Sequence, residues 1–153
     1  MHGFVSHYTN RLDSKGRVSI PAQFRAVLTR DGYEGLYCFP SPHQPVVDAG
    51  GNALIEQIDA LLKEMKAFSF EHDTMSTALY GNSEIFRVDG EGRVMLSDKI
   101  KRYAGITDQV VFVGLGYKFQ IMSPDYFAER SMNALRHAFG AGGQSSASGE
   151  GGA

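Results

Sequence analysis

Two segments of the chain repeat the same spacing of acidic, glycine and arginine residues. Residues 13–20 read Asp-Ser-Lys-Gly-Arg-Val-Ser-Ile, and residues 89–96 read Asp-Gly-Glu-Gly-Arg-Val-Met-Leu. Both match Asp-x-x-Gly-Arg-Val-x-aliphatic, and the second copy lies 76 residues after the first. A guanidinium group can bind phosphate or guanine through two parallel hydrogen bonds, so both segments carry side chains suited to nucleic-acid recognition.

The arginine of each motif has two possible roles. In the first, both arginines, together with Arg11 and Lys15, project from hairpins toward phosphates or base edges, since a two-stranded ribbon can enter a major groove. In the second, each arginine pairs with the aspartate four residues before it and only stabilises the turn. Two copies of the motif indicate a repeated fold, and they leave both roles open.

The distribution of charge along the chain favours the first role. The chain has 15 basic and 17 acidic residues, which give a net charge of −2. Residues 1–30 carry a net +4, residues 87–102 carry a net +2, and the remaining 107 residues carry a net −8. The basic side chains are therefore concentrated in the two repeated segments, as contact with phosphates requires.

Each motif must be positioned by a β-hairpin. Extended segments precede the two motifs, in residues 4–12 and 83–88. After Gly16 and Gly92, the Val-x-aliphatic alternation has the period of a half-buried strand. The aspartate can accept hydrogen bonds from backbone N–H groups across the turn, and glycine can adopt a positive φ without a steric penalty.

Further strands differ between the two copies. Residues 109–113 and 117–121 predict a second hairpin in the second copy, whereas the first copy shows only the apolar residues 36–39 before its Ser-Pro dipeptide. We match residues 36–39 with residues 118–121, which also precede a Ser-Pro dipeptide. This match predicts that one strand of the first copy is missing or truncated.

Helical patterns connect and close the two copies. They occur in residues 21–28, 54–68, 75–80, 97–104 and 126–139. One apolar face is expected in the second of these segments, formed by Leu54, Ile58, Leu61, Leu62, Met65 and Phe68. The last segment has Phe127, Leu135 and Phe139 as its expected apolar anchors.

The chain is predicted to have five parts. They are a first repeat in residues 1–50, a helical linker in 51–80, a second repeat in 81–125, a C-terminal helix in 126–139 and a tail in 140–153. The tail has no large apolar residue, so we expect it to be disordered.

Catalytic and metal chemistry find no support in the sequence. The five histidines and the single cysteine, Cys38, do not occur at metal-ligand spacing, and no hydrolase, zinc-protease or nucleotide-loop motif is present. We expect no catalytic residue, metal, cofactor or small-molecule substrate, and a packed thiol at Cys38. We also expect no signal peptide, no membrane-spanning segment and a reducing, cytoplasmic location.

The doubled motif and the run Tyr103-Ala104-Gly105-Ile106 resemble the MraZ family of bacterial transcriptional regulators, which have two tandem SpoVT-AbrB domains. The resemblance covers roughly residues 1–139. It implies an α+β fold in which both repeats form an AbrB-like swapped-hairpin β-barrel with flanking helices. It also implies a ring-shaped homo-oligomer that binds double-stranded DNA at direct repeats in the promoter of the division and cell-wall gene cluster, at the nucleoid.

The resemblance and the charge pattern together select the candidate site residues. The candidate DNA contacts are Arg11, Lys15, Arg17, Arg25 and Arg93, and the candidate turn residues are Asp13, Gly16, Asp89 and Gly92. The second motif has Glu91 where the first has Lys15, and a carboxylate repels phosphate, so we expect the first repeat to dominate DNA contact. The alternative hypothesis is a protein-interaction or assembly module with an antitoxin-like AbrB fold.

Overall fold

The computed structural model describes residues 3–140, which divide into one compact unit ending at Ser123 and a second beginning at Pro124. The elements of the first unit are β1 (His7–Arg11), β2 (Arg17–Ser19), α1 (Ala22–Asp31), β3 (Leu36–Pro40), β4 (Val47–Gly50), α2 (Asn52–Lys63), α3 (Phe70–Ser76), the π-helical turn η1 (Thr77–Gly81), β5 (Glu84–Phe86), β6 (Arg93–Met95), α4 (Asp98–Ala104), β7 (Gln109–Gly114) and β8 (Phe119–Met122). The second unit has α5 (Pro124–Leu135) and η2 (Arg136–Gly140). Apart from Gly140, the predicted tail lies outside the described residues.

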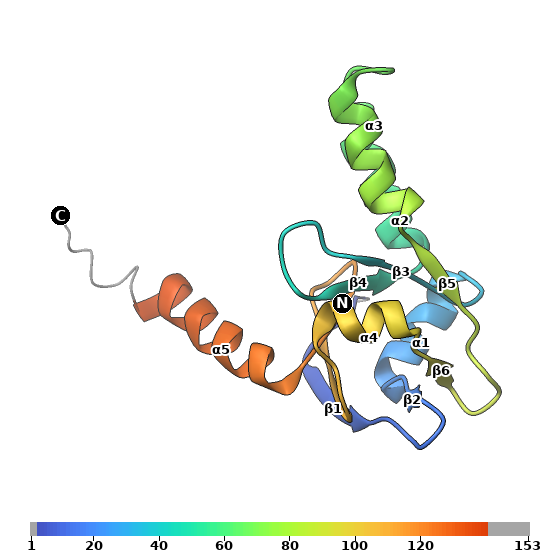
Figure 1. The fold of residues 1–153 in the computed structure, drawn as a ribbon, viewed down its shortest axis with the longest axis vertical. Helices are drawn as coiled ribbons and strands as arrows, with labels where there is room; N and C mark the ends of the chain where they lie inside the picture. Colours follow the sequence, from blue (N-terminus) through green and yellow to red (C-terminus); the bar gives the residue numbers. More distant parts are fainter. Residues whose placement is uncertain (1–2, 141–153) are drawn as a thin grey trace. The chain divides into compact units, whose positions relative to one another are not determined.

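The described strands form two antiparallel sheets, which confirms an α+β fold (Figure 1). A six-stranded sheet has the order β1-β7-β8-β4-β3-β5, and β2 pairs with β6 in a separate ribbon. Within residues 3–140 this arrangement is open, in contrast to the closed barrel that the resemblance implies. The sheet does not close because β1 and β5 lie at its opposite edges, while β2 and β6 pair with each other instead of bridging those edges.

The two repeats exchange their first strands. The β1 strand of the first repeat pairs with β7 of the second, so that Tyr8 lies opposite Phe112. The β5 strand of the second repeat pairs with β3 of the first, and Glu84 lies opposite Cys38. Each half of the sheet therefore contains strands from both repeats, and neither repeat has a complete sheet of its own.

The strand pairing corrects the predicted match between the two copies. Strand β3 lies between β5 and β4, just as β7 lies between β1 and β8, so β3 corresponds to β7 and β4 to β8. Residues 36–39 thus correspond to residues 110–113, and the first repeat lacks no strand. The pattern missed β4 because its four residues are all buried, Asp48 included, and show no alternation.

An approximate twofold axis relates the two repeats. Val18 of β2 lies opposite Val94 of β6, its counterpart in the other repeat. In the main sheet, Asp48 of β4 likewise lies opposite its counterpart, Gln120 of β8. Two strand pairs whose central residues face their own equivalents mark the positions through which such an axis passes.

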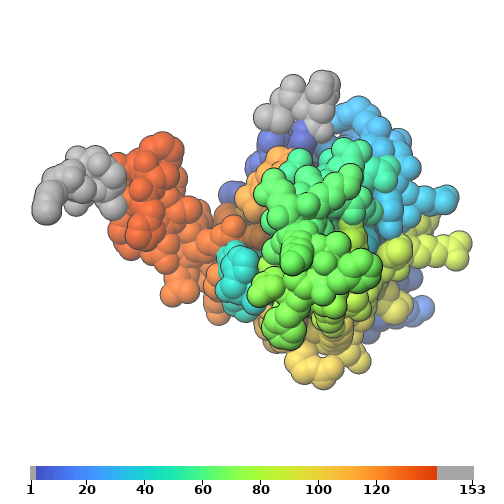
Figure 2. Space-filling view, turned by 90° about the horizontal axis from the view of Figure 1, so that it is seen from above, coloured from blue at the N-terminus to red at the C-terminus, as the bar shows by residue number. Residues whose placement is uncertain are grey.

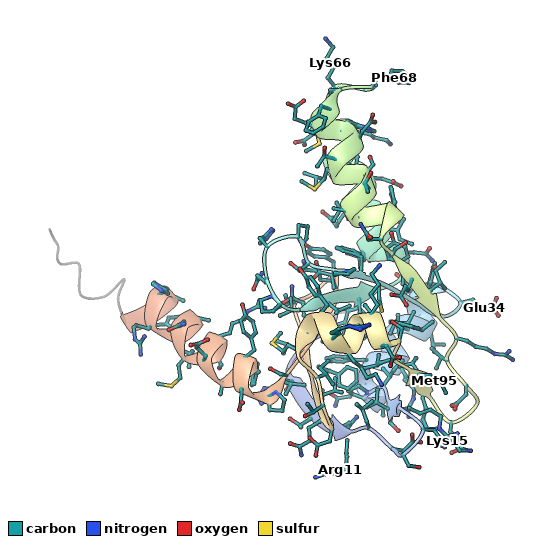
Figure 3. All side chains as sticks on the ribbon, viewed as in Figure 1. Arg11, Lys15, Glu34, Lys66, Phe68 and Met95 are labelled. Carbon is teal, nitrogen blue, oxygen red and sulfur yellow. The ribbon has the colours of Figure 1, made fainter. Side chains whose placement is uncertain are left out.

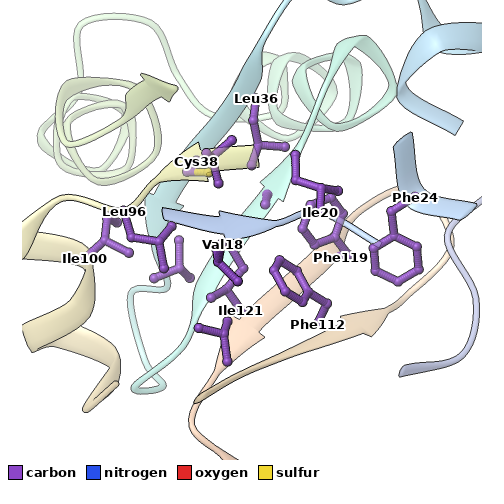
Figure 4. Close-up of a cluster of buried hydrophobic side chains, with 14 of the residues drawn as sticks. Val18, Ile20, Phe24, Leu36, Cys38, Leu96, Ile100, Phe112, Phe119 and Ile121 are labelled. Carbon is purple, nitrogen blue, oxygen red and sulfur yellow. The ribbon is translucent and has the colours of Figure 1, made fainter. Parts of the chain in front are cut away.

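Alternating side chains of the main sheet contribute to two apolar clusters. Leu36 and Cys38 of β3 belong to a large cluster shared by both repeats, and Tyr37 and Phe39 belong to a smaller one with α2 and η1. Figure 4 shows ten labelled members of the large cluster: Val18, Ile20, Phe24, Leu36, Cys38, Leu96, Ile100, Phe112, Phe119 and Ile121. The large cluster joins β2, β6, α1 and α4 to one face of the sheet.

Two helical expectations need correction. One is the end of the helix predicted in residues 54–68, and the other is the start of the helix predicted in residues 75–80. Helix α2 ends at Lys63, and Phe68 lies beyond it with φ +67° and 96% exposed, so Phe68 is not part of the buried apolar face. The next helix starts at Phe70, because the Ser69 hydroxyl accepts a hydrogen bond from the His72 N–H at 3.1 Å and caps it. Seen from above, α3 lies in the foreground of the first unit (Figure 2).

The second unit is a helix with an exposed apolar end. No residue of α5 is buried, and Leu135 and Phe139 are exposed. The anchoring role expected for these two side chains therefore stays a prediction.

Candidate nucleic-acid interface

The first motif forms a tight turn around a single carboxylate. Asp13 Oδ1 accepts hydrogen bonds from the backbone N–H groups of Lys15 and Arg17, both at 2.9 Å. Asp13 Oδ2 accepts a further hydrogen bond from Arg17 Nε at 2.7 Å. Gly16 has φ +86°, a backbone conformation that glycine adopts at low cost. The aspartate, glycine and arginine of the motif therefore define one structural unit.

The second motif repeats this geometry closely. Asp89 Oδ1 accepts hydrogen bonds from the backbone N–H groups of Glu91 and Arg93 at 2.9 Å, and Asp89 Oδ2 accepts from Arg93 Nε at 2.9 Å. Gly92 has φ +79°. The aspartate–arginine pair of the second possible role, which stabilises the turn, is thus present in both repeats.

The hydrogen bonds of the turns favour the ionised carboxylates. The backbone N–H of Arg17 is the largest cause that lowers the pKa of Asp13, to about 2. The backbone N–H of Arg93 likewise lowers the pKa of Asp89, and the Asp89 side chain raises the pKa of Arg93. At neutral pH both turns therefore hold a charged pair.

Pairing through Nε orients the arginines and leaves other donors for a ligand. A guanidinium group has five N–H donors, and the bond to Asp13 uses the Nε donor of Arg17. Arg93 differs, because its Nη1 also lies 3.6 Å from Glu91 Oε1. Pairing within the turn and contact with an anion are consequently compatible, since they use different atoms of the same side chain.

The ribbon of β2 and β6 presents the arginines on its exposed face. Val18 and Val94 at its centre are each 1% exposed and pack into the large cluster. Side chains on the two sides of these valines point to the other face of the ribbon. They are Arg17, Ser19, Arg93 and Met95.

Arg25 lies over the turn of the second repeat. Its Nη1 donates a hydrogen bond to the Ile20 carbonyl at 2.5 Å, and its side chain covers the turn of the other repeat. A Cβ placed on Gly92 would lie only 2.4 Å from Arg25 Cδ. In the other half, Lys101 Nζ lies 3.6 Å from a Cβ placed on Gly16. Each repeat therefore places a basic residue of its helix over the turn of the other repeat.

Arg11 and Lys15 are the exposed cations of the first turn. Arg11 Nη1 forms an ion pair with Asp108 Oδ2 at 2.9 Å, and both side chains are exposed. The Asp108 contact had no signal in the sequence, because it joins residues from different repeats. Figure 3 shows Arg11 and Lys15 pointing outward near the first turn, with Met95 on the neighbouring strand. Lys15 and Arg17 thus lie on the first turn, and Arg11 lies at the end of the strand that enters it.

Three further findings concern Cys38, potential metal ligands and membrane-spanning helices. Cys38 is buried, and burial raises the pKa of its thiol well above the ordinary value. Among residues 3–140, no group of three or more His, Cys, Asp or Glu side chains could hold a metal ion. No described helix combines the length and the apolar character needed to cross a membrane.

Comparison with known proteins gives a consistent family. No protein-family model matches the chain. The chain is 56% identical over 139 residues to the transcriptional regulator MraZ of Methylocella silvestris, covering 89% of this chain and 85% of the relative. It is 53% identical over 146 residues to the MraZ of Xanthobacter autotrophicus, covering 92% and 93%. It is 40% identical over 134 residues to the MraZ of Rhizobium meliloti, covering 88% and 92%.

Each of these relatives matches at least 88% of the chain, so each match extends into both repeats. At this identity and coverage, the chain belongs to the MraZ family of transcriptional regulators.

Proposed function

We propose that this chain regulates transcription by sequence-specific binding of double-stranded DNA through the β2–β6 ribbon and its two turns. The observation that carries the proposal is the repeated turn, which holds an arginine on the exposed face of the ribbon in each repeat. A two-stranded ribbon fits the major groove, where arginine can bind guanine. The family name of the relatives supports the same role.

The phosphate contacts belong to the side chains around the first turn. Arg11 and Lys15 are exposed there, and Arg17 keeps donors beyond its bond to Asp13. The second turn has Glu91, which both repels phosphate and lies close to Arg93. The first repeat therefore supplies most of the electrostatic affinity, as the sequence predicts.

Assembly would strengthen this binding. A single ribbon makes few contacts with DNA, and several ribbons on one oligomer would bind repeated sites at a high effective concentration. We propose a ring-shaped homo-oligomer on direct repeats in the promoter of the division and cell-wall gene cluster, at the nucleoid. We further propose that the exchanged first strands are those of an AbrB-like swapped-hairpin fold.

A salt titration tests the DNA interface. The probe is the duplex upstream of the chain's own gene, and binding is followed by fluorescence anisotropy at several salt concentrations. We expect Lys15→Ala to reduce the magnitude of the slope of log K against log [salt] by about 0.9, the value for one lost phosphate contact. Arg17→Ala should also weaken binding.

Arg136→Ala is the matched control, because it removes an exposed arginine from η2. Far-UV circular dichroism checks that each variant is folded. If Lys15→Ala and Arg17→Ala keep both the affinity and the slope of the parent, the ribbon does not bind DNA. Retention of a protein partner without retention of DNA would then favour the assembly-module alternative.

A further inference from the structure

The exposed face of the β2–β6 ribbon carries four side chains in two facing pairs. Arg17 lies opposite Met95, and Ser19 lies opposite Arg93. Backbone hydrogen bonds from Ile20 N to Gly92 O, at 2.9 Å, and from Leu96 N to Gly16 O, at 3.3 Å, flank these pairs. Both are therefore non-hydrogen-bonded pairs, the type of antiparallel pair in which the two side chains lie closest together. The four side chains therefore form one small, continuous patch.

The approximate twofold axis makes the differences within this patch visible. It passes between Val18 and Val94, so it relates Arg17 to Arg93 and Ser19 to Met95. The arginine positions are the same in both repeats, whereas the other pair combines a small hydroxyl with a long apolar side chain. In the adjoining turns, Lys15 corresponds to Glu91 in the same way.

Met95 is the unexpected member of the patch. Its side chain is 55% exposed on a strand whose neighbouring valine is almost fully buried. Burial of an apolar side chain stabilises a fold, and an apolar side chain left this exposed gives up much of that stabilisation. An exposed apolar side chain beside an arginine is suited to a ligand that offers an apolar group next to an acceptor, as a thymine methyl group offers next to a guanine in the major groove.

We propose that Ser19 and Met95, together with Lys15 and Glu91, give the DNA site of each chain a direction. This inference rests on the proposed DNA binding. Arg17 and Arg93 bind equivalent acceptors in the two halves of the site. Met95 selects a thymine methyl in one half, and Ser19 forms a hydrogen bond with a base edge in the other. Lys15 binds a phosphate in one half of the site, whereas Glu91 repels the equivalent phosphate in the other half.

A directional site has a consequence for assembly. Protomers of a ring are related by rotation alone, so the ribbons of neighbouring chains have the same orientation along the ring. Chains that each read a directional site would therefore require head-to-tail copies of that site. A ribbon with two identical halves would bind a palindromic site, which reads the same in both directions.

Selection from a random pool tests the direction. The full chain is incubated with duplexes that contain a randomised central segment, and bound duplexes are sequenced over several rounds. Two variants each make the ribbon symmetric. E91K/M95S gives the second repeat the residues of the first, and K15E/S19M does the reverse. All four positions are exposed, so both variants should keep the fold, which circular dichroism verifies.

We expect the parent chain to select a non-palindromic motif. The two symmetric variants should select two different palindromes, each built from one half of the parent motif. Each variant should bind the parent motif roughly tenfold more weakly than its own palindrome, because one half of the parent motif is mismatched. Phe68→Ser, which changes an exposed residue between α2 and α3, should select the parent motif.

The outcomes separate the two proposals. If the parent chain enriches no motif, DNA recognition itself is wrong. If the parent chain enriches a motif that both symmetric variants also enrich unchanged, DNA recognition stands and the assignment of Ser19 and Met95 is overturned. A palindromic motif for the parent chain would overturn that assignment as well.

Discussion

Gly16 and Gly92 share a left-handed backbone conformation but differ in their surroundings. An added Cβ on Gly16 would meet only Lys101 Nζ, at 3.6 Å, which is an ordinary van der Waals contact. An added Cβ on Gly92 would lie 2.4 Å from Arg25 Cδ, which is too close for any real contact. Gly16 is therefore required for its φ alone, and Gly92 both for its φ and for the space beneath Arg25.

Alanine substitutions should distinguish these two requirements. We expect Gly16→Ala to lower the free energy of unfolding by roughly 1–2 kcal/mol through backbone strain. Gly92→Ala should cost about 1 kcal/mol more, because Arg25 must move and lose its hydrogen bond to the Ile20 carbonyl. Urea denaturation measures both values.

The Arg25→Ala background serves as the control for this comparison. Without the Arg25 side chain, the two glycine substitutions should have nearly equal effects. Equal effects in the parent chain would mean that Arg25 moves aside without cost.

At the scale of elements, β4 and β8 join the two repeats through a buried polar contact. Gln120 Nε2 donates a hydrogen bond to Asp48 Oδ1 at 2.6 Å, and Lys118 Nζ lies 3.3 Å from the same oxygen. The Asp48 side chain is only 6% exposed, so these two contacts replace the hydration that burial removes. The hydrogen bond between Asp48 and Gln120 thus fixes the register of β4 against β8 at the centre of the six-stranded sheet.

Removal of this carboxylate should be costly. We expect Asp48→Ala to lower the free energy of unfolding by about 3 kcal/mol, because it removes the buried carboxylate that accepts from the Gln120 amide and pairs with the Lys118 ammonium. Asp48→Asn keeps an acceptor for Gln120 and should cost less. Thermal and urea unfolding of the two variants test this order, and an Asp48→Ala variant as stable as the parent would contradict it.

Elements with a local signal were predictable from the sequence, and those without one were not. The Asp-x-x-Gly-Arg motif predicts both turns because their hydrogen bonds lie within five consecutive residues. Strand β4 had no such signal, since a buried Asp48 breaks the apolar pattern and its partner Gln120 is 72 residues away. Residue spacing also could not show which strands pair, so the contact between Arg11 and Asp108 was missed.

At the scale of the whole molecule, the exchanged strands make the first unit one cooperative structure. The large apolar cluster contains Phe24 of the first repeat and Ile100, its counterpart in the second. Phe24 packs edge-on against Phe4, with ring centroids 5.3 Å apart, and lies 4.9 Å from the ring of Phe119 in the second repeat. Since the core is shared, neither repeat can lose its packing alone.

We therefore expect a single unfolding transition for the chain. Phe24→Ala should lower the free energy of unfolding by about 3–5 kcal/mol and Ile100→Ala by about 2–5 kcal/mol, with each shifting the same transition. Far-UV circular dichroism and tyrosine fluorescence should give coincident curves. Two transitions, each moved by only one of these substitutions, would show that the repeats fold independently.

The pairing of β1 with β7 also affects how the chain folds as it is synthesised. His7 and Arg11 are translated 106 and 98 residues before their partners, Val113 and Gln109. Strand β1 must remain unpaired until β7 has been translated, and its edge groups have no sheet partner during that time. The same exchange that unites the two repeats in the finished protein therefore postpones pairing of β1 until the second repeat has been synthesised.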